Sequence, residues 1–455
     1  MLPSPLRPVR GLLPSPSSSA RVARGSALAV RPVRAPVFPQ RNDWPALHGP
    51  VRALLSQEPF RGRAAIERVR VHAARVGLGV LACVPARDEA DRLPRTLDAL
   101  AASLAQIGEP TGILVLVNNA SDGSASAAWE WARNQSLSVA VVEAHLDSGI
   151  ADAGHARRLA LDLGSLVVRT DAVLLTTDAD TRVARDWAPR LVRHIRAGAG
   201  CAAGMIDVEP SEFAELPKAV HEVERTERAL FREHARTWRL IVPDEPLALA
   251  LRVGGASLGV SASAYRRVGG LPALSVCEDR AMVARMIEYD ERVVFDERAT
   301  IRTSCRLEGR AQGGMAGMLM RRVREPDPHC DEALHTAHQF AALCLAWRCL
   351  REGWDAAMRL RIADLLGCDP DDLVADASHG QAWTRLLAAL PATERLRASD
   401  VRSELARSRA LRGLVSGDGP RTRPATLLRR LEECQDGPGA IPVPSPSPGE
   451  IMNHA

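Results

Sequence analysis

The stretch that decides the fold reads Leu174-Leu-Thr-Thr-Asp178-Ala-Asp180, an apolar run typical of a β-strand that ends in two carboxylates. Side chains alternate along a strand, so residues i and i+2 share a face, and Asp178 and Asp180 could meet one cation. Mg²⁺ and Mn²⁺ bind carboxylate oxygens and keep water or substrate phosphates as further ligands, so the pair suits a metal-bound diphosphate. Alternatively, the motif caps a helix that begins near Ala184. Taken alone, the motif favours the cap, and only its context favours the metal.

The composition indicates a folded protein with reduced cysteines. With 455 residues, 46% of them hydrophobic and 25% charged, the chain can bury a large core. Its 59 basic and 55 acidic residues leave a net charge of +4, too balanced to indicate a nucleic-acid or membrane partner. The nine cysteines form no Cys-x-x-Cys pair, which is typical of cytosolic proteins, and no apolar run is long enough to span a bilayer. We therefore expect a cytoplasmic protein with no transmembrane segment.

Four regions follow from changes in composition along the chain. Residues 1–45 are rich in Arg, Pro and Ser, and we expect them to be disordered. Residues 79–315 alternate apolar runs with helical patterns, which predicts an α/β domain with a mixed, mostly parallel sheet flanked by helices. Residues 316–436 show helical periodicity only, and residues 437–455 form a second Pro-rich, disordered tail.

Within the α/β region, strands are predicted by short apolar runs and helices by periodicity. The predicted strands lie near 79–84, 112–117, 138–142, 172–176, 200–206 and 254–260. The predicted helices lie near 91–106, 124–134, 153–164, 184–197 and 211–238, and a helix at 280–287 follows the turn of Gly269 and Gly270.

Six motifs follow one another along this region. In order they are Val84-Pro-Ala-Arg-Asp-Glu89, Val117-Asn-Asn-Ala-Ser-Asp-Gly-Ser124, Gly154-His-Ala-Arg-Arg158, Asp178-Ala-Asp180, Gly254-Gly-Ala-Ser257 and Cys277-Glu-Asp279. Their order and spacing over residues 79–315 resemble the family 2 glycosyltransferases of the GT-A fold. The motifs fall at successive strand ends, where ligands bind in an open α/β sheet. We therefore expect them to converge on one crevice.

The resemblance implies that the first loop, with Pro85, Arg87 and Glu89, holds the base and ribose of a nucleotide-sugar. Acidic residues in this loop could equally cap the following helix. In the second loop the family usually has a carboxylate where this chain has Asn118. An amide both donates and accepts hydrogen bonds, whereas a carboxylate only accepts, so the identity of the base stays open.

The diphosphate of the donor is expected to meet basic side chains and a metal. The resemblance places Arg157 near the diphosphate, although a solvated helix arginine is the alternative. Asp180 is expected to bind Mn²⁺ or Mg²⁺ directly, with Asp178 at the metal or the ribose. Arg306 and Arg310 flank a Gly-rich segment that could contact phosphate or be only a surface turn.

The Glu278-Asp279 pair resembles the family motif in which the aspartate is the general base of an inverting displacement. A helix cap is again the alternative. Together these features predict a metal-dependent inverting glycosyltransferase that moves a sugar from a nucleotide-sugar donor to the hydroxyl of an unknown acceptor. A sugar-phosphate nucleotidyltransferase is the closest alternative, although the first loop lacks the glycines typical of that class. A non-catalytic binding scaffold is the other.

Two further features lie in the helical region. His335 and His338 are spaced i, i+3 and suggest zinc, but closed zinc sites usually show tighter pairs. The stripe of Trp347, Leu350 and Trp354 follows helical spacing and is most simply core packing.

Overall fold

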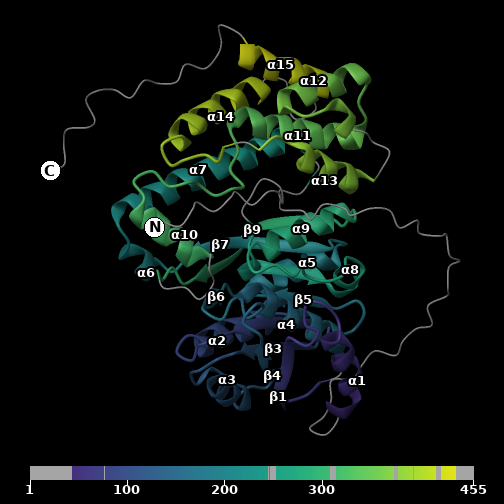
Figure 1. The fold of residues 1–455 in the computed structure, drawn as a ribbon, viewed down its shortest axis with the longest axis vertical. Coiled ribbons are helices and arrows are strands. Elements are labelled where there is room, and N and C mark those ends of the chain that lie inside the picture. The colour runs from purple at the N-terminus through teal and green to yellow at the C-terminus, as the bar shows by residue number, and fades with distance from the viewer. Residues whose placement is uncertain are drawn as a thin grey trace, which may run out of the picture.

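The computed structural model describes residues 44–436, except 76, 244, 246–252, 308–313, 374–377, 393 and 417–421. The predicted tails at 1–45 and 437–455 therefore fall almost wholly outside the described residues. The described chain divides into a sheet-based part and a layer of helices (Figure 1). The predicted boundary between them near residue 315 stays a prediction.

A mixed nine-stranded sheet organises the first part, in the order β1-β4-β3-β2-β5-β8-β7-β9-β6. The strands are β1 (Ala64–His72), β2 (Val80–Ala86), β3 (Thr111–Asn118), β4 (Ser138–Leu146), β5 (Val173–Thr176), β6 (Thr181–Val183), β7 (Cys201–Val208), β8 (Leu258–Ser261) and β9 (Val293–Thr303). Strands β4, β3, β2 and β5 are parallel neighbours, and β8 runs antiparallel between β5 and β7. The predicted α/β class is confirmed.

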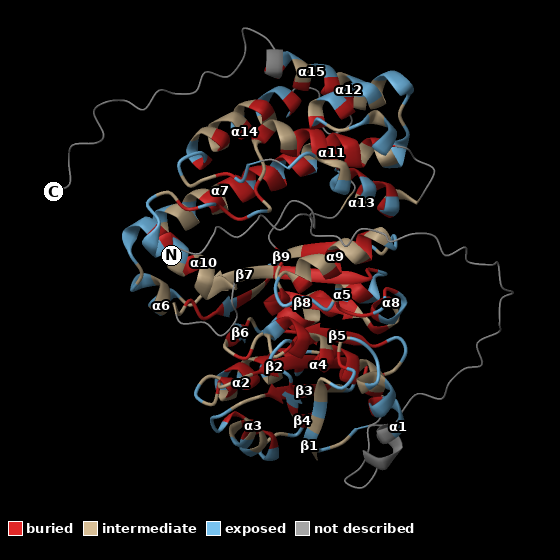
Figure 2. Ribbon diagram, in the orientation of Figure 1, coloured by how far each residue is buried: buried red, intermediate tan, exposed pale blue. Residues whose placement is uncertain are grey.

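Helices cover both faces of the sheet, so the central strands β2, β3 and β5 are buried on both sides (Figure 2). In β2, Val80, Ala82 and Val84 belong to one hydrophobic cluster, and Leu81 and Cys83 belong to the other. The first face is covered by α2 (Leu93–Leu104), α3 (Ser124–Arg133) and α5 (Trp187–Arg196), and the second by α4 (Ala153–Val167), α8 (Ala262–Arg267) and α9 (Glu278–Glu288). This explains why the strands read as continuous apolar runs.

Several elements differ from the sequence prediction. The helix expected near 184–197 is present as α5 but begins only at Trp187, because residues 181–183 form the short strand β6, which pairs with β9. The charged helix expected at 211–238 is divided into α6 (Pro210–Ala214) and α7 (Lys218–Ile241), because Pro217 ends the first and precedes the second. The strand expected at 254–260 begins only at Leu258, after the 3₁₀ turn η2 (Gly255–Ser257).

The helical layer is built on α7, which packs against α11 (Ala337–Glu352) and α14 (Val401–Ser416). It also contains α10 (Met315–Arg324), α12 (Ala356–Leu366), α13 (His379–Ala389) and α15 (Pro424–Asp436), and α1 (Trp44–Leu55) lies at the opposite end of the molecule (Figure 1). Trp347 of α11 contacts Trp383 of α13 and Trp238 of α7, with ring centroids 5.0 and 5.9 Å apart. The prediction of core packing for the stripe at Trp347 is confirmed.

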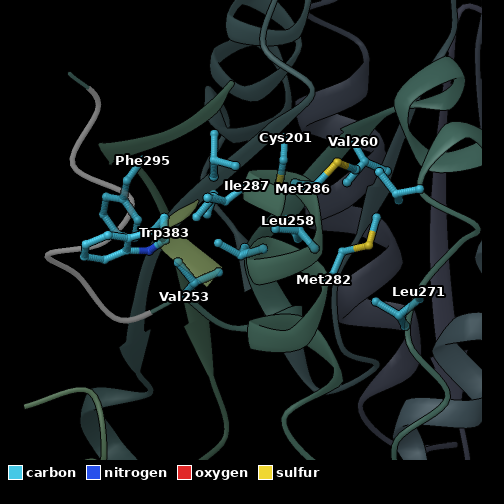
Figure 3. Packing of buried hydrophobic residues seen from close by; sticks show 14 of the residues in the cluster. Cys201, Val253, Leu258, Val260, Leu271, Met282, Met286, Ile287, Phe295 and Trp383 are labelled. Carbon is cyan, nitrogen blue, oxygen red and sulfur yellow. The ribbon is translucent and has the colours of Figure 1, made fainter. Parts of the chain in front are cut away.

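The two parts meet along α9. Met282, Met286 and Ile287 of this helix lie in one hydrophobic cluster with Trp383 of α13 and Phe295 of β9 (Figure 3). Helix α9 therefore packs on the sheet and on the helical layer at once. Among the helices that the structure describes, none is both long and apolar enough to cross a bilayer.

Burial of His234 in α7 should make folding stability depend on pH. Its ring stacks on Phe340 at 4.0 Å, and burial together with nearby His335 lowers its pKa to about 3. The unfolded chain then binds a proton first as the pH falls, so unfolding becomes easier below the ordinary histidine pKa of about 6.5. Protonation of His234 in the unfolded chain should cost the wild type roughly 2 kcal/mol of stability between pH 7 and pH 5. His234→Phe should not show this part of the loss.

Urea unfolding at a series of pH values measures this difference. The matched control is His329→Phe at an exposed position, which should leave the slope unchanged. Equal slopes for the wild type and His234→Phe would contradict the expectation.

Candidate active site

The loops after β2 and β3 are bound to each other at the edge of the sheet. The Asp88 carboxylate accepts a hydrogen bond from the Ser121 amide at 2.6 Å, and Asp122 accepts one from the Ala90 amide at 2.9 Å. Helix α2 begins only at Leu93, and its N-cap makes no side-chain hydrogen bond. The carboxylate of Asp88 therefore stabilises the neighbouring loop, not the start of the helix.

The two asparagines after β3 have different surroundings. Asn119 has a positive φ of 48°, and its side chain bonds both the amide and the carbonyl of Leu146, at 3.0 and 2.9 Å. Beyond the end of β3, the Asn119 side chain thus makes the two hydrogen bonds to Leu146 that a strand backbone would otherwise make. Asn118 is buried, and its amide bonds only the Asn119 side chain, at 3.3 Å. Asn118 therefore remains the candidate for contact with a ligand.

A buried arginine links the middle motifs. Arg157 of α4 donates to the Asp178 carboxylate at 2.7 Å and to Glu278 at 3.0 Å. It also donates to the Thr176 hydroxyl at 3.1 Å and to the Gly255 carbonyl at 3.0 Å. Although burial alone would lower its pKa, the two carboxylates raise the pKa of Arg157 above its usual value. Arg157 is therefore a charged, internal group, and the alternative of a solvated helix arginine is wrong.

Topology explains why these groups meet. Strands β2, β3 and β5 are parallel, so their carboxyl ends lie on one edge of the sheet. Strand β8 is antiparallel to β5, with Leu258 opposite Thr176, so the turn η2 before it lies at that same edge. The end of β9 joins them, because Thr303 pairs with Thr181. Only strand pairing brings these segments together.

A second group of charges surrounds Asp180. Arg306 bonds both carboxylate oxygens of Glu89, with one distance of 3.1 Å, and lies 3.2 Å from the Asp180 carboxylate. Burial, then the charges of Asp178 and Glu89, raises the pKa of Asp180 to about 6, although Arg306 and Arg92 oppose the shift. Burial and the two neighbouring carboxylates therefore outweigh the arginines in their effect on the pKa of Asp180.

Glu278 and Asp279 open α9 and point to different partners. Glu278 is buried against Arg157, and burial raises its pKa. Asp279 is only partly buried, and its carboxylate accepts from the Gly255 amide at 2.6 Å and from the Arg280 amide at 2.7 Å. The Asp279 carboxylate is thus fixed in orientation next to the Arg157 group.

The remaining predicted residues lie at the margin of this site. Arg87 donates to the carbonyl of Ala151 at 3.0 Å, which ties the first loop to the segment before α4. Pro85 is buried within β2. Arg310 lies outside the described residues, so its predicted contact with phosphate stays a prediction.

Three residues that the sequence did not single out anchor the segment that carries Arg306. Arg92 donates to Glu212 at 3.0 Å, and Glu212 accepts from the Ser304 hydroxyl at 2.7 Å and the Cys305 amide at 2.9 Å. Glu212 follows β7 and Ser304 follows β9, and these strands are parallel neighbours. Since β9 was not predicted, no sequence signal pointed to this contact.

The carboxylates do not form a complete metal site by themselves. Within the described part of the chain, no three side chains of His, Cys, Asp or Glu gather closely enough to hold a metal ion. Asp178 and Asp180 lie in a turn beyond the end of β5, so strand alternation does not govern them as the sequence analysis assumed. This finding also gives the histidine pair in the helical layer no metal partner among those residues.

Residues 82–253 match the profile of the family described as "Glycosyl transferase family 2". These residues are a family 2 glycosyltransferase domain. The match spans the first four motifs and supports the predicted glycosyltransferase class, and the sheet flanked by helices agrees with the predicted fold. Glu278, Asp279 and Arg306 follow the matched segment, and their roles rest on the geometry above.

Solved structures of other glycosyltransferases resemble this one distantly. A mannosyltransferase from Pyrobaculum calidifontis, in complex with GDP-Man and Mn²⁺, has 16% identity over 79% of this chain and 86% of its own, with a TM-score of 0.38. TarS from S. aureus, in complex with UDP-GlcNAc, has 14% identity over 79% and 91%, also with a TM-score of 0.38.

Glucosyl-3-phosphoglycerate synthase from Mycobacterium tuberculosis has 14% identity over 55% of this glycosyltransferase and 81% of its own chain, with a TM-score of 0.32. No curated protein matches the sequence significantly. These TM-scores are low, so the glycosyltransferase assignment rests on the family match and not on the structural neighbours.

Gly255 is expected to be essential to the geometry around Arg157. A Cβ atom at this position would lie 2.7 Å from Arg157 Nε and 2.8 Å from its Cζ. The guanidinium cannot move away without breaking its hydrogen bonds, so Gly255→Ala should cost about 1–3 kcal/mol of stability through overpacking. Urea unfolding measures the change.

Gly413→Ala in α14 is the control, because nothing lies within 4 Å of its added Cβ. It should stabilise the helix by up to about 1 kcal/mol. If Gly255→Ala proved as stable as the wild type, the tight packing around Arg157 would be refuted.

Proposed function

We propose that this chain is a metal-dependent inverting glycosyltransferase that transfers a sugar from a nucleotide-sugar to an acceptor hydroxyl. The Arg157 guanidinium carries the proposal, because it joins Asp178 on the donor side to Glu278 in α9. Through the Gly255 turn it also reaches Asp279, whose carboxylate bonds the Gly255 amide. One connected group thus includes the residues assigned to the diphosphate and to the acceptor.

The loops after β2 and β3 are proposed to hold the nucleoside. Glu89 and Asn118 are both buried at this edge of the sheet, and Asn118 keeps amide groups for the base. Pro85 and Arg87 shape the first loop beside them. An amide can pair with a donor or an acceptor on the base, so the choice of nucleotide is left to experiment.

The residues present fit a divalent cation next to a diphosphate. Asp180, with Asp178, offers hard oxygen ligands, and two carboxylates leave coordination positions for phosphate and water. Burial, then the charges of Asp178 and Glu89, raises the pKa of Asp180, and a cation beside it would favour the ionised carboxylate. When bound, Mn²⁺ or Mg²⁺ would offset the charge on the leaving diphosphate. Arg306 is proposed to move from the Asp180 carboxylate to the phosphates.

Asp279 is proposed to be the general base. The acceptor oxygen attacks the anomeric carbon and gives its proton to the Asp279 carboxylate. The bond between the anomeric carbon and the diphosphate oxygen breaks, and the nucleoside diphosphate leaves with the electron pair. Attack comes from the face opposite the leaving group, so the configuration inverts. The two amides that bond Asp279 hold it in place, and Glu278 positions Arg157.

The nine cysteines are all free thiols, which supports a cytoplasmic location as part of this proposal.

A screen of nucleotide-sugars by thermal stabilisation tests the donor site. A donor present at 100 times its dissociation constant should add about 2.7 kcal/mol of stability, and the effect should require Mn²⁺ or Mg²⁺. Asp180→Asn should lose this metal-dependent stabilisation. Stabilisation that ignores the metal would contradict the assignment of Asp180, and turnover of a nucleoside triphosphate with a sugar phosphate would identify a nucleotidyltransferase.

Asp279→Asn tests the base. The amide keeps one oxygen for a backbone amide, so the fold and donor affinity should persist, while transfer should fall by about 100-fold or more without the base. Release of the nucleoside diphosphate in the presence of an acceptor measures transfer. Glu130→Gln, at an exposed position of α3, is the matched control with full activity. Transfer retained by Asp279→Asn would remove Asp279 from this role.

A further inference from the structure

A cavity of about 370 Å³ lies in the helical layer, between the start of α11 and the end of α12. Its wall includes His335, His338, Asp364, Glu394 and Arg395, and the segment before α11 adds Glu332. A volume of this size falls in the range of small-molecule sites. The sugar-transfer chemistry described above uses none of these residues.

The cavity adjoins the proposed catalytic end of α9. Glu332, on its wall, bonds the Arg280 guanidinium and lies 3.6 Å from the Cys277 thiol. Arg280 also bonds both oxygens of Asp331, at 2.8 and 3.0 Å. Cys277 and Arg280 flank the Glu278-Asp279 pair. Through Glu332, the cavity wall is therefore joined to the first turn of α9, which also carries Asp279.

The wall carries mixed hydrogen-bonding groups with an excess of carboxylates. The carboxylates of Glu332, Asp364 and Glu394 and the guanidinium of Arg395 line it, and Glu332 is paired with Arg280, which lies outside the wall. Arg395 is held by a bond to the Cys330 carbonyl. Such a wall offers both donors and acceptors.

The two histidines add groups that can both donate and accept. Burial lowers the pKa values of His335 and His338, so both rings are neutral near pH 7. His335 bonds Gln339 at 3.3 Å, and the buried Nε2 of His338 has no hydrogen-bond partner among the residues that the structure describes. A hydroxyl group suits such rings, because it can donate to one nitrogen and accept from another.

We propose that this cavity binds an uncharged polyhydroxyl portion of the acceptor, such as a sugar or glycoside, and presents its reacting hydroxyl to Asp279. The inference rests on the proposed function, since it names the acceptor class of that same site. A phosphorylated acceptor is disfavoured, because three carboxylates on the wall repel an anion and neither arginine is free of a partner. The helical layer thus selects the acceptor, and the α/β part binds the donor.

Saturation-transfer NMR on the full chain, with methyl mannoside, maltose and lactose against mannose phosphate, tests this inference. We expect at least one neutral saccharide to bind and mannose phosphate to bind more weakly. Asp364→Arg and His338→Leu each remove a polar partner, so each should raise the dissociation constant of the bound saccharide by about tenfold. Glu433→Arg, at an exposed position of α15, is the control and should leave it unchanged.

Hydrolysis of the donor by water, measured on the same variants, separates this inference from the proposed function. Asp364→Arg should keep the wild-type rate of donor hydrolysis while losing transfer to the saccharide through a higher KM. Donor hydrolysis without binding of any neutral saccharide, equal binding by all variants, or tighter binding of mannose phosphate would overturn the inference alone. Saccharide binding without binding of any nucleotide-sugar would overturn the proposed function instead.

Discussion

The buried guanidinium of Arg157 is the interaction on which the rest of the site depends. It bonds groups from the end of β5, from η2 and from the start of α9, which are far apart in the sequence. An ion pair in such surroundings is stable only when most of its hydrogen bonds are made, and losing one partner leaves a buried charge. The segments proposed to bind the donor and the acceptor are therefore held in one geometry by a single side chain.

The charge balance at the neighbouring Asp180 is different. Three carboxylates, of Glu89, Asp178 and Asp180, lie close together, and Arg306 pairs with two of them. Each guanidinium nitrogen of Arg157, by contrast, donates a hydrogen bond. The proposed move of Arg306 to the phosphates would change its partners and leave the Arg157 group in place. A preorganised frame beside an adaptable charge is what a transfer to a bound acceptor requires.

Helix α9 connects this chemistry to the helical layer. Its apolar side packs on the sheet and on Trp383 (Figure 3). Its first turn carries Asp279, the proposed base, and Arg280, which bonds Asp331 and the cavity residue Glu332. Helix α7 lies within residues 79–315, the predicted α/β region, yet it packs with α11 and α14. The helical layer thus belongs to the architecture of the site.

The sequence by itself determined the strands β2 to β5, the helices between them and the loops that carry Glu89, Asn118 and Asp178, because apolar runs and helical periodicity are local signals. It did not predict β1, β6 or β9, since half-polar or very short strands are recognised only by their partners. Tertiary structure alone decided that Arg157 is internal and that Asp279 bonds the Gly255 amide. Both follow from strand order, and a pairing between distant segments leaves no periodic trace in either of them.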